Sequence, residues 1–470
     1  MSMSFHSDNG LKQVPKRAGE QWYTLLAYLI LVVSAIIVIE MIYAPHLSQA
    51  KQAAVFPVIT MMAYSLSLSE IFILLTIVLG ISTILCDWIL RRQKIILATP
   101  FMQVFIYLFA ILMIISIIQG AINRNIALLY NIRIMAIHPF LYIMFLNLRM
   151  PRWTEKAVLS IFAVGLFGQV IISFGYLFIP EFISLFVVNL DTYSDWFALL
   201  AAGLVYSLVI WRILSSKFSI TWLAALLVIH ANIIMHIYQK PVVLAYTVIL
   251  FSLLVYAIQQ RGRSRIRAAT LLGILFFYSV GIIMIMPTNL QQDFFDTAMN
   301  RYAKSIRVPV QGSETEYSYV MIKDLDSGRF AIWNWYLTEA LQGWGFSPHG
   351  FGQPQTVIVA GKEYLGKSPH NYLIYYSYEC GLIAGFALLF ILLIFLANGV
   401  RMLLRKMKDL QYDAVIPIYA FCLGVIATNL VGLSISEMRI AWLFWFCVAY
   451  TIKKWNAAKS TMAKTCLENN

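Results

Sequence analysis

The chain has 470 residues, of which 60% are hydrophobic and 12% are charged, and its formal net charge is +13 at pH 7. A soluble globular protein carries about 25% charged residues, so this composition and a mean hydropathy of +0.75 exclude that class. In a soluble chain the surplus of cations would suggest nucleic acid. In a membrane protein the distribution of Lys and Arg between loops sets the orientation in the bilayer, so the positive charge does not indicate nucleic acid. We therefore expect a lipid bilayer and no nucleic acid as partner.

Apolar runs close to the roughly 20 residues that cross a bilayer recur throughout the sequence. We therefore predict an all-α polytopic membrane protein with about twelve transmembrane helices. Nine fall within 22–287 and three within 371–452. The runs are 22–44, 67–90, 100–120, 127–147, 157–179, 195–214, 220–237, 241–258, 268–287, 371–397, 412–432 and 438–452.

The first run follows a basic segment, 1–21, and no small-residue cleavage site comes after it, so we interpret it as an anchor and not a removable signal. Threading the runs through a membrane puts most Lys and Arg residues in alternate connections. By the positive-inside rule those connections are cytoplasmic. Both the N-terminal segment and the tail 453–470 are therefore expected in the cytoplasm.

Cysteine and histidine residues give no metal-ligand pattern. The five cysteines lie in apolar runs or the tail, so we expect neither a disulfide framework nor a metal site. His138, His230 and His236 lie in or beside apolar spans, and a hydrogen-bonded packing role is expected for each. The sequence predicts no metal and no cofactor.

One connection, 288–370, is much longer than the others and lies on the trans side. A structureless loop of that length is uncommon, so we expect a small folded element or lid with short helices. Within it, the stretch 328–341 has apolar residues near helical spacing. Arg329 and Trp333 are four apart and share one face of this expected helix.

The stretch Q-G-W-G-F-S-P-H-G-F-G-Q, residues 342–353, follows this helix. Its glycines permit backbone conformations closed to other residues and allow a close approach of a ligand. A phosphate-binding loop is one interpretation, but no strand precedes the stretch and no basic residue follows at the required spacing. A plain turn is the simpler interpretation.

The stretch K-S-P-H-N-Y-L-I-Y-Y-S-Y-E-C-G begins at Lys367 and opens the tenth run. It places His370 and Asn371 at the start of the expected helix and Glu379 inside it. An ionised carboxylate inside a membrane span costs several kcal/mol unless it is paired or wetted. Either packing or chemistry must therefore account for these polar residues.

Three motifs in this order, R-x3-W, a glycine-rich turn, and H-N-x2-L-x5-E-x-G-x3-G, together resemble the shared core of the O-antigen ligase and polysaccharide polymerase superfamily. The resemblance is strong over about 325–390, and elsewhere it is one of topology, helix count and the position of the long loop. The matching positions are Arg329, Trp333, Gly345 to Gly352, His370, Asn371, Leu373, Glu379, Gly381 and Gly385. Members look like GT-C-type glycosyltransferases of the bacterial inner membrane.

This resemblance implies a metal-independent inverting transfer at the periplasmic face. The donor would be an undecaprenyl-diphosphate-linked glycan, and the acceptor either lipid A-core, as in a ligase, or a second lipid-linked glycan, as in a polymerase. A protein hydroxyl is a third acceptor. His370 would activate the acceptor hydroxyl, and Arg329 would bind the diphosphate leaving group.

Each motif residue also has a structural interpretation. His370 could cap the next helix, and Arg329 could pair with Asp324 or Asp326. The tryptophans Trp333, Trp335 and Trp344 fit interfacial anchors, and stacking on a sugar ring is the alternative. We include Asn371 and Trp333 in the expected substrate-binding set.

Three further cations join that set. Many superfamily members carry an arginine after a serine where this chain has Gln239-Lys240-Pro241, so Lys240 offers a charge without the bidentate fork; it could also snorkel. Arg133 lies inside an apolar run and could bind substrate or pair with Glu379, which we expect to hold a cation as a structural charge partner. Arg439 could join the site or pair with Glu437.

A transporter or flippase of polysaccharide lipids is the alternative outside the family. Twelve spans and intramembrane charges fit such a protein. The sequence has no visible internal repeat, however, and the long loop divides the chain unevenly, whereas many transporters are built from two similar halves.

Overall fold

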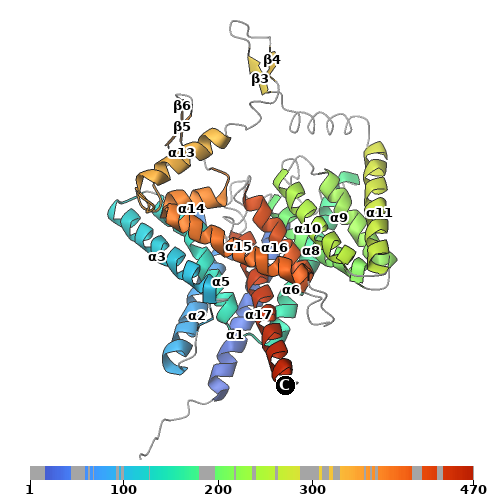
Figure 1. The fold of residues 1–470 in the computed structure, drawn as a ribbon, viewed down its shortest axis with the longest axis horizontal. Coiled ribbons are helices and arrows are strands. Elements are labelled where there is room, and N and C mark those ends of the chain that lie inside the picture. The colour runs from blue at the N-terminus through green and yellow to red at the C-terminus, as the bar shows by residue number, and fades with distance from the viewer. Residues whose placement is uncertain are drawn as a thin grey trace, which may run out of the picture.

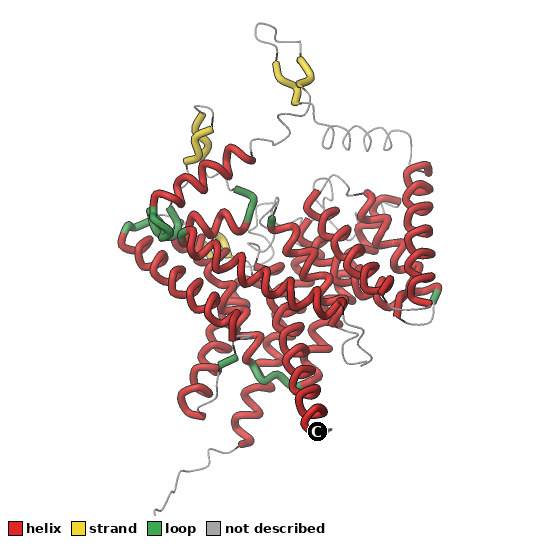
Figure 2. Tube along the Cα trace, in the orientation of Figure 1, coloured by secondary structure: helices red, strands yellow, loops and turns green. Residues whose placement is uncertain are grey.

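Helices dominate the computed structural model of the chain (Figures 1 and 2). The structure describes residues 16–43, 59–61, 64–66, 68–91, 95–96, 100–125, 127–178, 196–215, 219–235, 240–259, 263–285, 306–309, 317–320, 329–353, 356–359, 362–365, 369–404, 415–430 and 438–468. Because an apolar helix satisfies its own backbone hydrogen bonds, it is the element that long apolar runs adopt in lipid.

The helices of the N-terminal half are α1 (Lys16–Tyr43), α2 (Leu68–Arg91), α3 (Pro100–Ile122), α4 (Leu128–Asn131), the π-helical turn η1 (Ile132–Ala136), α5 (Ile137–Asn147), α6 (Arg152–Phe178) and α8 (Trp196–Ser215). Those of the C-terminal half are α9 (Ile220–Met235), α10 (Lys240–Gln259), α11 (Arg263–Ile285), α13 (Arg329–Gln342), α14 (Tyr372–Cys380), α15 (Leu382–Leu404), α16 (Val415–Asn429) and α17 (Met438–Glu468). Each of the predicted apolar runs falls on one or more of these helices.

Eight of the described helical segments are long and apolar enough to cross a membrane by length and composition. Three apolar segments, in α8, α9 and α16, are shorter. The chain is therefore a helical, multi-pass membrane protein, as predicted, and the count of twelve spans stays a prediction. Large apolar side chains such as Val164 and Phe277, each 74% exposed, lie on the outer surface of the bundle, where lipid would cover them.

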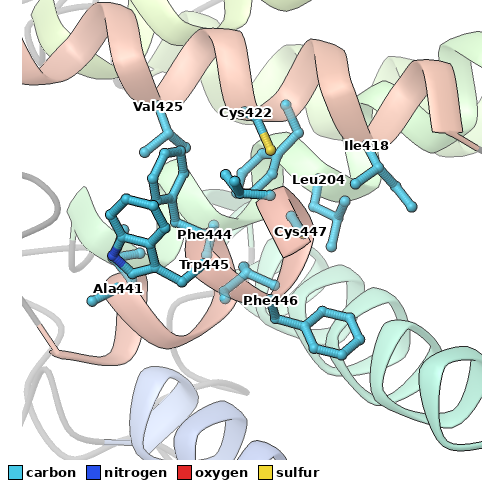
Figure 3. Close-up of a cluster of buried hydrophobic side chains, with 14 of the residues drawn as sticks. Leu204, Ile418, Cys422, Val425, Ala441, Phe444, Trp445, Phe446 and Cys447 are labelled. Carbon is cyan, nitrogen blue, oxygen red and sulfur yellow. The ribbon is translucent and has the colours of Figure 1, made fainter. Parts of the chain in front are cut away.

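The centre of the bundle is formed by α16 and its neighbours. Ile418, Cys422 and Val425 of α16 pack against Phe444 and Cys447 of α17 in a buried cluster (Figure 3). On its other side α17 meets α5, where Phe145 packs edge to face on Trp442 with ring centroids 4.8 Å apart. These large aromatic rings hold α17 between α16 and α5.

The two ends of the molecule carry different parts of the chain (Figure 1). The first turns of α1 and the C-terminus lie at one end, and α13 lies at the opposite end. The membrane sides on which the termini and the long loop lie, and which of them faces the cytoplasm, stay predictions.

The described strands form three two-stranded antiparallel hairpins. They are β1 (Ile59–Met61) with β2 (Tyr64–Leu66), β3 (Ile306–Pro309) with β4 (Tyr317–Val320), and β5 (Thr356–Val359) with β6 (Lys362–Leu365). Two of them, β3–β4 and β5–β6, project beyond the helices (Figures 1 and 2). Sequence patterns predicted only short helices in the long loop. There the structure has the helix α13 and two hairpins.

The predicted span 371–397 is divided in two. Helix α14 ends at Cys380, Gly381 adopts a φ of 93°, and α15 begins at Leu382. A Cβ added at Gly385 of α15 would collide with Ser377 of α14, so the two helices fold back on each other as a hairpin. Gly381 permits the reversal because only glycine adopts this φ without strain.

Candidate active site

Asn371 caps α14. Its φ of −143° and ψ of 119° are those of a cap residue, and its Oδ1 accepts hydrogen bonds from the backbone N–H groups of Leu373 (3.0 Å) and Ile374 (3.1 Å). Its Nδ2 donates to the carbonyl of Leu430 at the end of α16, at 3.0 Å. These bonds occupy both lone pairs of Oδ1, so the structure favours a capping role for Asn371 over the substrate-binding role we expected.

His370 immediately precedes this cap and has an exposed side chain, while Pro369 and Asn371 on either side are buried. Its φ of 49° is positive, a conformation that few residues other than glycine adopt and that clusters at functional sites. Because both neighbours are buried in the fold, the backbone position of His370 is fixed.

Trp333 links α13 to this segment. Its Nε1 donates a hydrogen bond of 2.5 Å to the carbonyl of Pro369, the residue before His370. Arg329 is the first residue of α13 and lies about 6 Å further along the helix axis, on the same face; its side chain lies outside the described residues. The predicted R-x3-W helix and the predicted histidine are thus brought together, and Trp333 has a positioning role.

Aromatic packing holds α13 along α14. The ring of Tyr378 lies 4.9 Å from that of Tyr336 and 5.9 Å from that of Trp335. Burial raises the pKa of Tyr336 well above its usual value, and the neighbouring Tyr378 and Glu379 raise it further. The phenol is therefore a neutral group, and Trp335 contributes ring packing to the helix pair.

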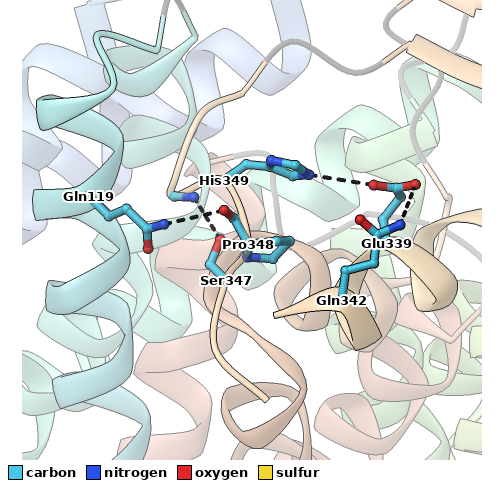
Figure 4. A network of polar contacts seen from close by, with 7 residues as sticks. Gln119, Glu339, Gln342, Ser347, Pro348 and His349 are labelled. Carbon is cyan, nitrogen blue, oxygen red and sulfur yellow. Dashed lines mark hydrogen bonds and ion pairs between the residues drawn. The ribbon is translucent and has the colours of Figure 1, made fainter. Parts of the chain in front are cut away.

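The glycine-rich segment 343–352, called the glycine turn below, follows α13 and contacts the end of α3 (Figure 4). It also contacts the start of α4, where Gly352 lies against Leu128. The carbonyl of Pro348 accepts a hydrogen bond from Gln119 at 3.4 Å, and that of His349 accepts one from Asn123 at 2.9 Å. A Cβ at Gly350 would collide with the backbone of Gly120. The glycines are therefore required for close packing.

Backbone N–H groups of the glycine turn are used inside the protein. Those of Gly350, Phe351 and Gly352 donate to Ser347 Oγ (2.9 Å), to the carbonyl of Ser116 (2.8 Å) and to Glu379 Oε2 (2.7 Å). A phosphate loop must offer such groups to its ligand. The structure therefore favours the plain-turn interpretation.

Glu379 is completely buried and accepts two hydrogen bonds from neutral donors. One is the bond from Gly352, and the other comes from Asn131 Nδ2 to Oε1 at 2.8 Å. These partners make it a clamp between the glycine turn and α4, because a buried carboxylate is stabilised by N–H donors as well as by charge. That Glu379 also holds a cation, as we expected, stays a prediction.

Arg133 lies in the π-helical turn η1, a type of distortion that often occurs at functional sites. Its Nη2 is 3.0 Å from Glu70 Oε1 in the first turn of α2, with side-chain exposures of 21% and 11%. Its guanidinium also lies 5.7 Å from the ring centroid of Tyr130. Glu70 therefore supplies a carboxylate to this guanidinium, and the roles considered for Arg133 in substrate binding or with Glu379 stay predictions.

Two other predicted cations are placed at helix starts. Lys240 is the first residue of α10, and its side chain lies outside the described residues. Arg439 is the second residue of α17 and is half-buried; its proposed partner Glu437 lies outside the described residues. Their predicted roles in substrate binding stay predictions.

The remaining histidines are placed as packing residues where they are described. His138 accepts from Trp445 Nε1 at 2.9 Å through Nδ1, so its Nε2 donates to the carbonyl of Ile134 at 2.7 Å. His230 contacts Ser279 at 3.0 Å, and His236 lies outside the described residues. In the described part of the chain, no three His, Cys, Asp or Glu side chains could together hold a metal ion.

Sequence reasoning missed an ionisable pair between α13 and the glycine turn. His349 Nε2 lies 3.5 Å from Glu339 Oε2, and Gln342 donates to the other oxygen at 3.2 Å (Figure 4). The side chains of His349 and Glu339 are 34% and 24% exposed. The ten-residue separation spans a helix end and a turn, so no periodic spacing could have indicated it.

No family model matches this chain, and comparison with curated proteins finds no significant match. The motif residues and their geometry therefore carry the functional proposal.

Proposed function

We propose that this protein is an O-antigen ligase-like glycosyltransferase of the bacterial inner membrane. It would transfer an undecaprenyl-diphosphate-linked glycan to lipid A-core, or to a growing polysaccharide, at the periplasmic face. The observation that carries the proposal is the hydrogen bond from Trp333 to Pro369. This bond brings the helix that begins at Arg329 to the residue preceding His370, so residues of two separate motifs meet.

In the proposed step an acceptor hydroxyl attacks the anomeric carbon of the donor glycan. His370 accepts the hydroxyl proton as the new C–O bond forms. The bond from the anomeric carbon to the diphosphate breaks on the opposite face, and undecaprenyl diphosphate leaves with the electron pair, which inverts the anomeric configuration. Arg329 stabilises the negative charge that develops on the leaving group.

The rigidity of the segment 369–371 supports the assignment of His370 as the base. Its neighbours are buried, and the cap bonds of Asn371 and the Trp333 bond fix the backbone on both sides. A general base contributes most when its position is set before the substrate binds, because no ordering is then needed during reaction.

A polysaccharide polymerase is the second candidate within the family, and its chemical step is the same. A transporter of polysaccharide lipids is the candidate outside it, and the Arg133–Glu70 pair between two predicted spans would suit an ion pathway. Transfer of a glycan without a membrane gradient separates an enzyme of either kind from a transporter.

The test uses purified full-length protein in detergent with an undecaprenyl-diphosphate-linked repeat unit. One reaction contains lipid A-core and the other contains only the donor, and mass spectrometry identifies the products. Glycosylated lipid A-core indicates a ligase, and elongated donor indicates a polymerase. Product in neither reaction, with folded protein and donor bound, would contradict the proposal.

A further inference from the structure

The end of α13 and the glycine turn expose three large apolar side chains. Leu341, Trp344 and Phe346 are 63%, 94% and 49% exposed. The exposed stripe of α13 changes character along its length, since Asn334 and Thr338 precede Leu341 on the same face. The helix therefore presents a polar surface near its start and an apolar one where it meets the turn.

This apolar segment is continuous with the outer surface of α15. The backbone N–H of Ile383, in the first turn of α15, donates to the carbonyl of Gly345 at 3.1 Å. Ile383, Phe386 and Phe390 are 36%, 57% and 44% exposed, and they lie in or next to the first turns of a segment long and apolar enough to cross a membrane. The turn therefore lies at the end of a surface that lipid covers.

Helix α3 extends the same surface. It packs beside α15, with the rings of Phe105 and Phe390 stacked at 5.0 Å. Ile118 and Ile122 near its end are 54% and 74% exposed, and the backbone of Phe351 is bonded to Ser116. The glycine turn thus covers the outer ends of two apolar helices, at the level where a bilayer would change from acyl chains to headgroups.

The backbone of the turn is held in an uncommon conformation that presents Trp344. Trp344 has a φ of 52°, which is strained for an aromatic residue. Its N–H donates to the carbonyl of Leu341 at 3.2 Å, and the N–H of Phe346 donates to that of Gly343 at 3.0 Å. These backbone hydrogen bonds fix the position of Trp344 in the turn. Its indole is a side chain that prefers the headgroup region of a bilayer.

We propose that Leu341, Trp344 and Phe346 insert into the headgroup boundary of the bilayer and anchor the glycine turn to the membrane. The partner is the lipid surface itself. Because the turn is bonded to Glu379 and continues into α13, the anchor would hold α13 at a fixed height above the lipid. Trp344 then differs in role from Trp333 and Trp335, which contact the protein.

Nitroxide labelling of the full-length protein in vesicles of phosphatidylethanolamine and phosphatidylglycerol tests this inference without measuring activity. Cys86 is exposed, and the side chain of Cys466 near the end of α17 lies outside the described part of the structure, so both are replaced by serine; Cys380, Cys422 and Cys447 are buried. A label at Trp344→Cys is compared with one at Asn334→Cys, the matched control on the polar part of α13. Phe346→Cys serves as a second position if Trp344→Cys fails to insert.

We expect the ratio of accessibility to oxygen over accessibility to a water-soluble nickel chelate to be several-fold higher at 344 than at 334, because oxygen concentrates in lipid. Equal accessibility to nickel at both positions would overturn the proposal. So would shielding of the 344 label from both reagents, which is the result expected if a second copy of the chain covers the segment.

Discussion

Gly352 donates its backbone N–H to Glu379 Oε2 at 2.7 Å, although 27 positions separate the two residues. The bond joins the glycine turn to α14 at a fully buried carboxylate. Asn131 binds the other carboxylate oxygen and adds α4 to the same contact. A single side chain therefore connects the glycine turn, α14 and α4.

Replacement of Glu379 by alanine should strongly destabilise the protein. It would leave the Gly352 N–H and the Asn131 amide buried without this acceptor, at about 1–3 kcal/mol for each unsatisfied group. Glu379→Gln keeps one acceptor oxygen and should cost less. Thermal unfolding in detergent measures both. Glu339→Ala is the control, because its partly exposed interaction with His349 should contribute less than about 1 kcal/mol; equal effects at 339 and 379 would contradict the clamp.

Gly381→Ala should also lower the unfolding temperature. Gly381 has a φ of 93°, and an added Cβ would collide with the backbone of Gly345 and Phe346. Gly273→Ala in α11 is the matched control, since a Cβ there meets nothing within 4 Å and alanine favours a helix by about 1 kcal/mol. Retention of the wild-type unfolding temperature by Gly381→Ala would mean that the helix hairpin is not formed.

The apolar runs allowed the helices to be predicted, because a run long enough to cross a bilayer must satisfy its backbone hydrogen bonds internally and therefore forms a helix. The hairpin of α14 and α15 could not be predicted in this way. The stretch 371–397 has no proline, and its polar residues do not mark an end of the helix; the reversal depends on contacts of Gly381 with Gly345 and of Gly385 with Ser377. Such contacts exist only after distant segments have packed.

The motif residues of the site were identifiable from the sequence, but several of their partners were not. Charge alone suggested a cation for Glu379, whereas the fold supplies a backbone N–H and an amide. For Arg133 the sequence left substrate binding and a pair with Glu379 open, and the fold gives it an ion pair with Glu70 on another helix. Local spacing can place Trp333 relative to Arg329, but it cannot show that Trp333 reaches Pro369.

Replacing only one residue of the Arg133–Glu70 pair should lower the stability of the protein. Its side chains are 21% and 11% exposed, and removing one partner of a buried pair typically costs about 3–5 kcal/mol, whereas replacing both can be nearly neutral. We expect Arg133→Met and Glu70→Met each to lower the unfolding temperature and the double variant to recover part of the loss. Additive losses in this cycle would show that the two residues are not coupled.

Trp333→Phe should lower turnover with little change in donor affinity. The ring is kept, but the N–H that binds the carbonyl of Pro369 is lost, so the segment with His370 is held less firmly and the base is misplaced. Trp335→Phe is the control, because its described contacts are ring packing. Initial rates at several donor concentrations separate the two parameters. A loss confined to donor affinity would assign Trp333 to substrate binding instead.

The roles of His370 and Arg329 can be separated by the same kinetics. If His370 is the base, His370→Ala should leave donor binding close to normal and lower turnover by about 10²–10⁴-fold, the range for a positioned general base. Arg329 engages the diphosphate in both the bound and the transition state, so Arg329→Ala should weaken donor affinity as well as rate. Arg329→Lys should recover only part of the donor affinity and rate that Arg329→Ala loses, because lysine keeps the positive charge but lacks the bidentate guanidinium.

Gel filtration and thermal unfolding must first show that each variant is folded. A folded His370→Ala variant with wild-type turnover would show that His370 is not the general base, because the reaction would then proceed without its imidazole. Full activity and unchanged donor affinity in Arg329→Lys would show that the bidentate geometry is not used on the diphosphate. Loss of donor affinity in His370→Ala, with turnover unchanged at saturation, would place His370 in donor binding. The next candidate for the general base would then be the His349–Glu339 pair beside α14.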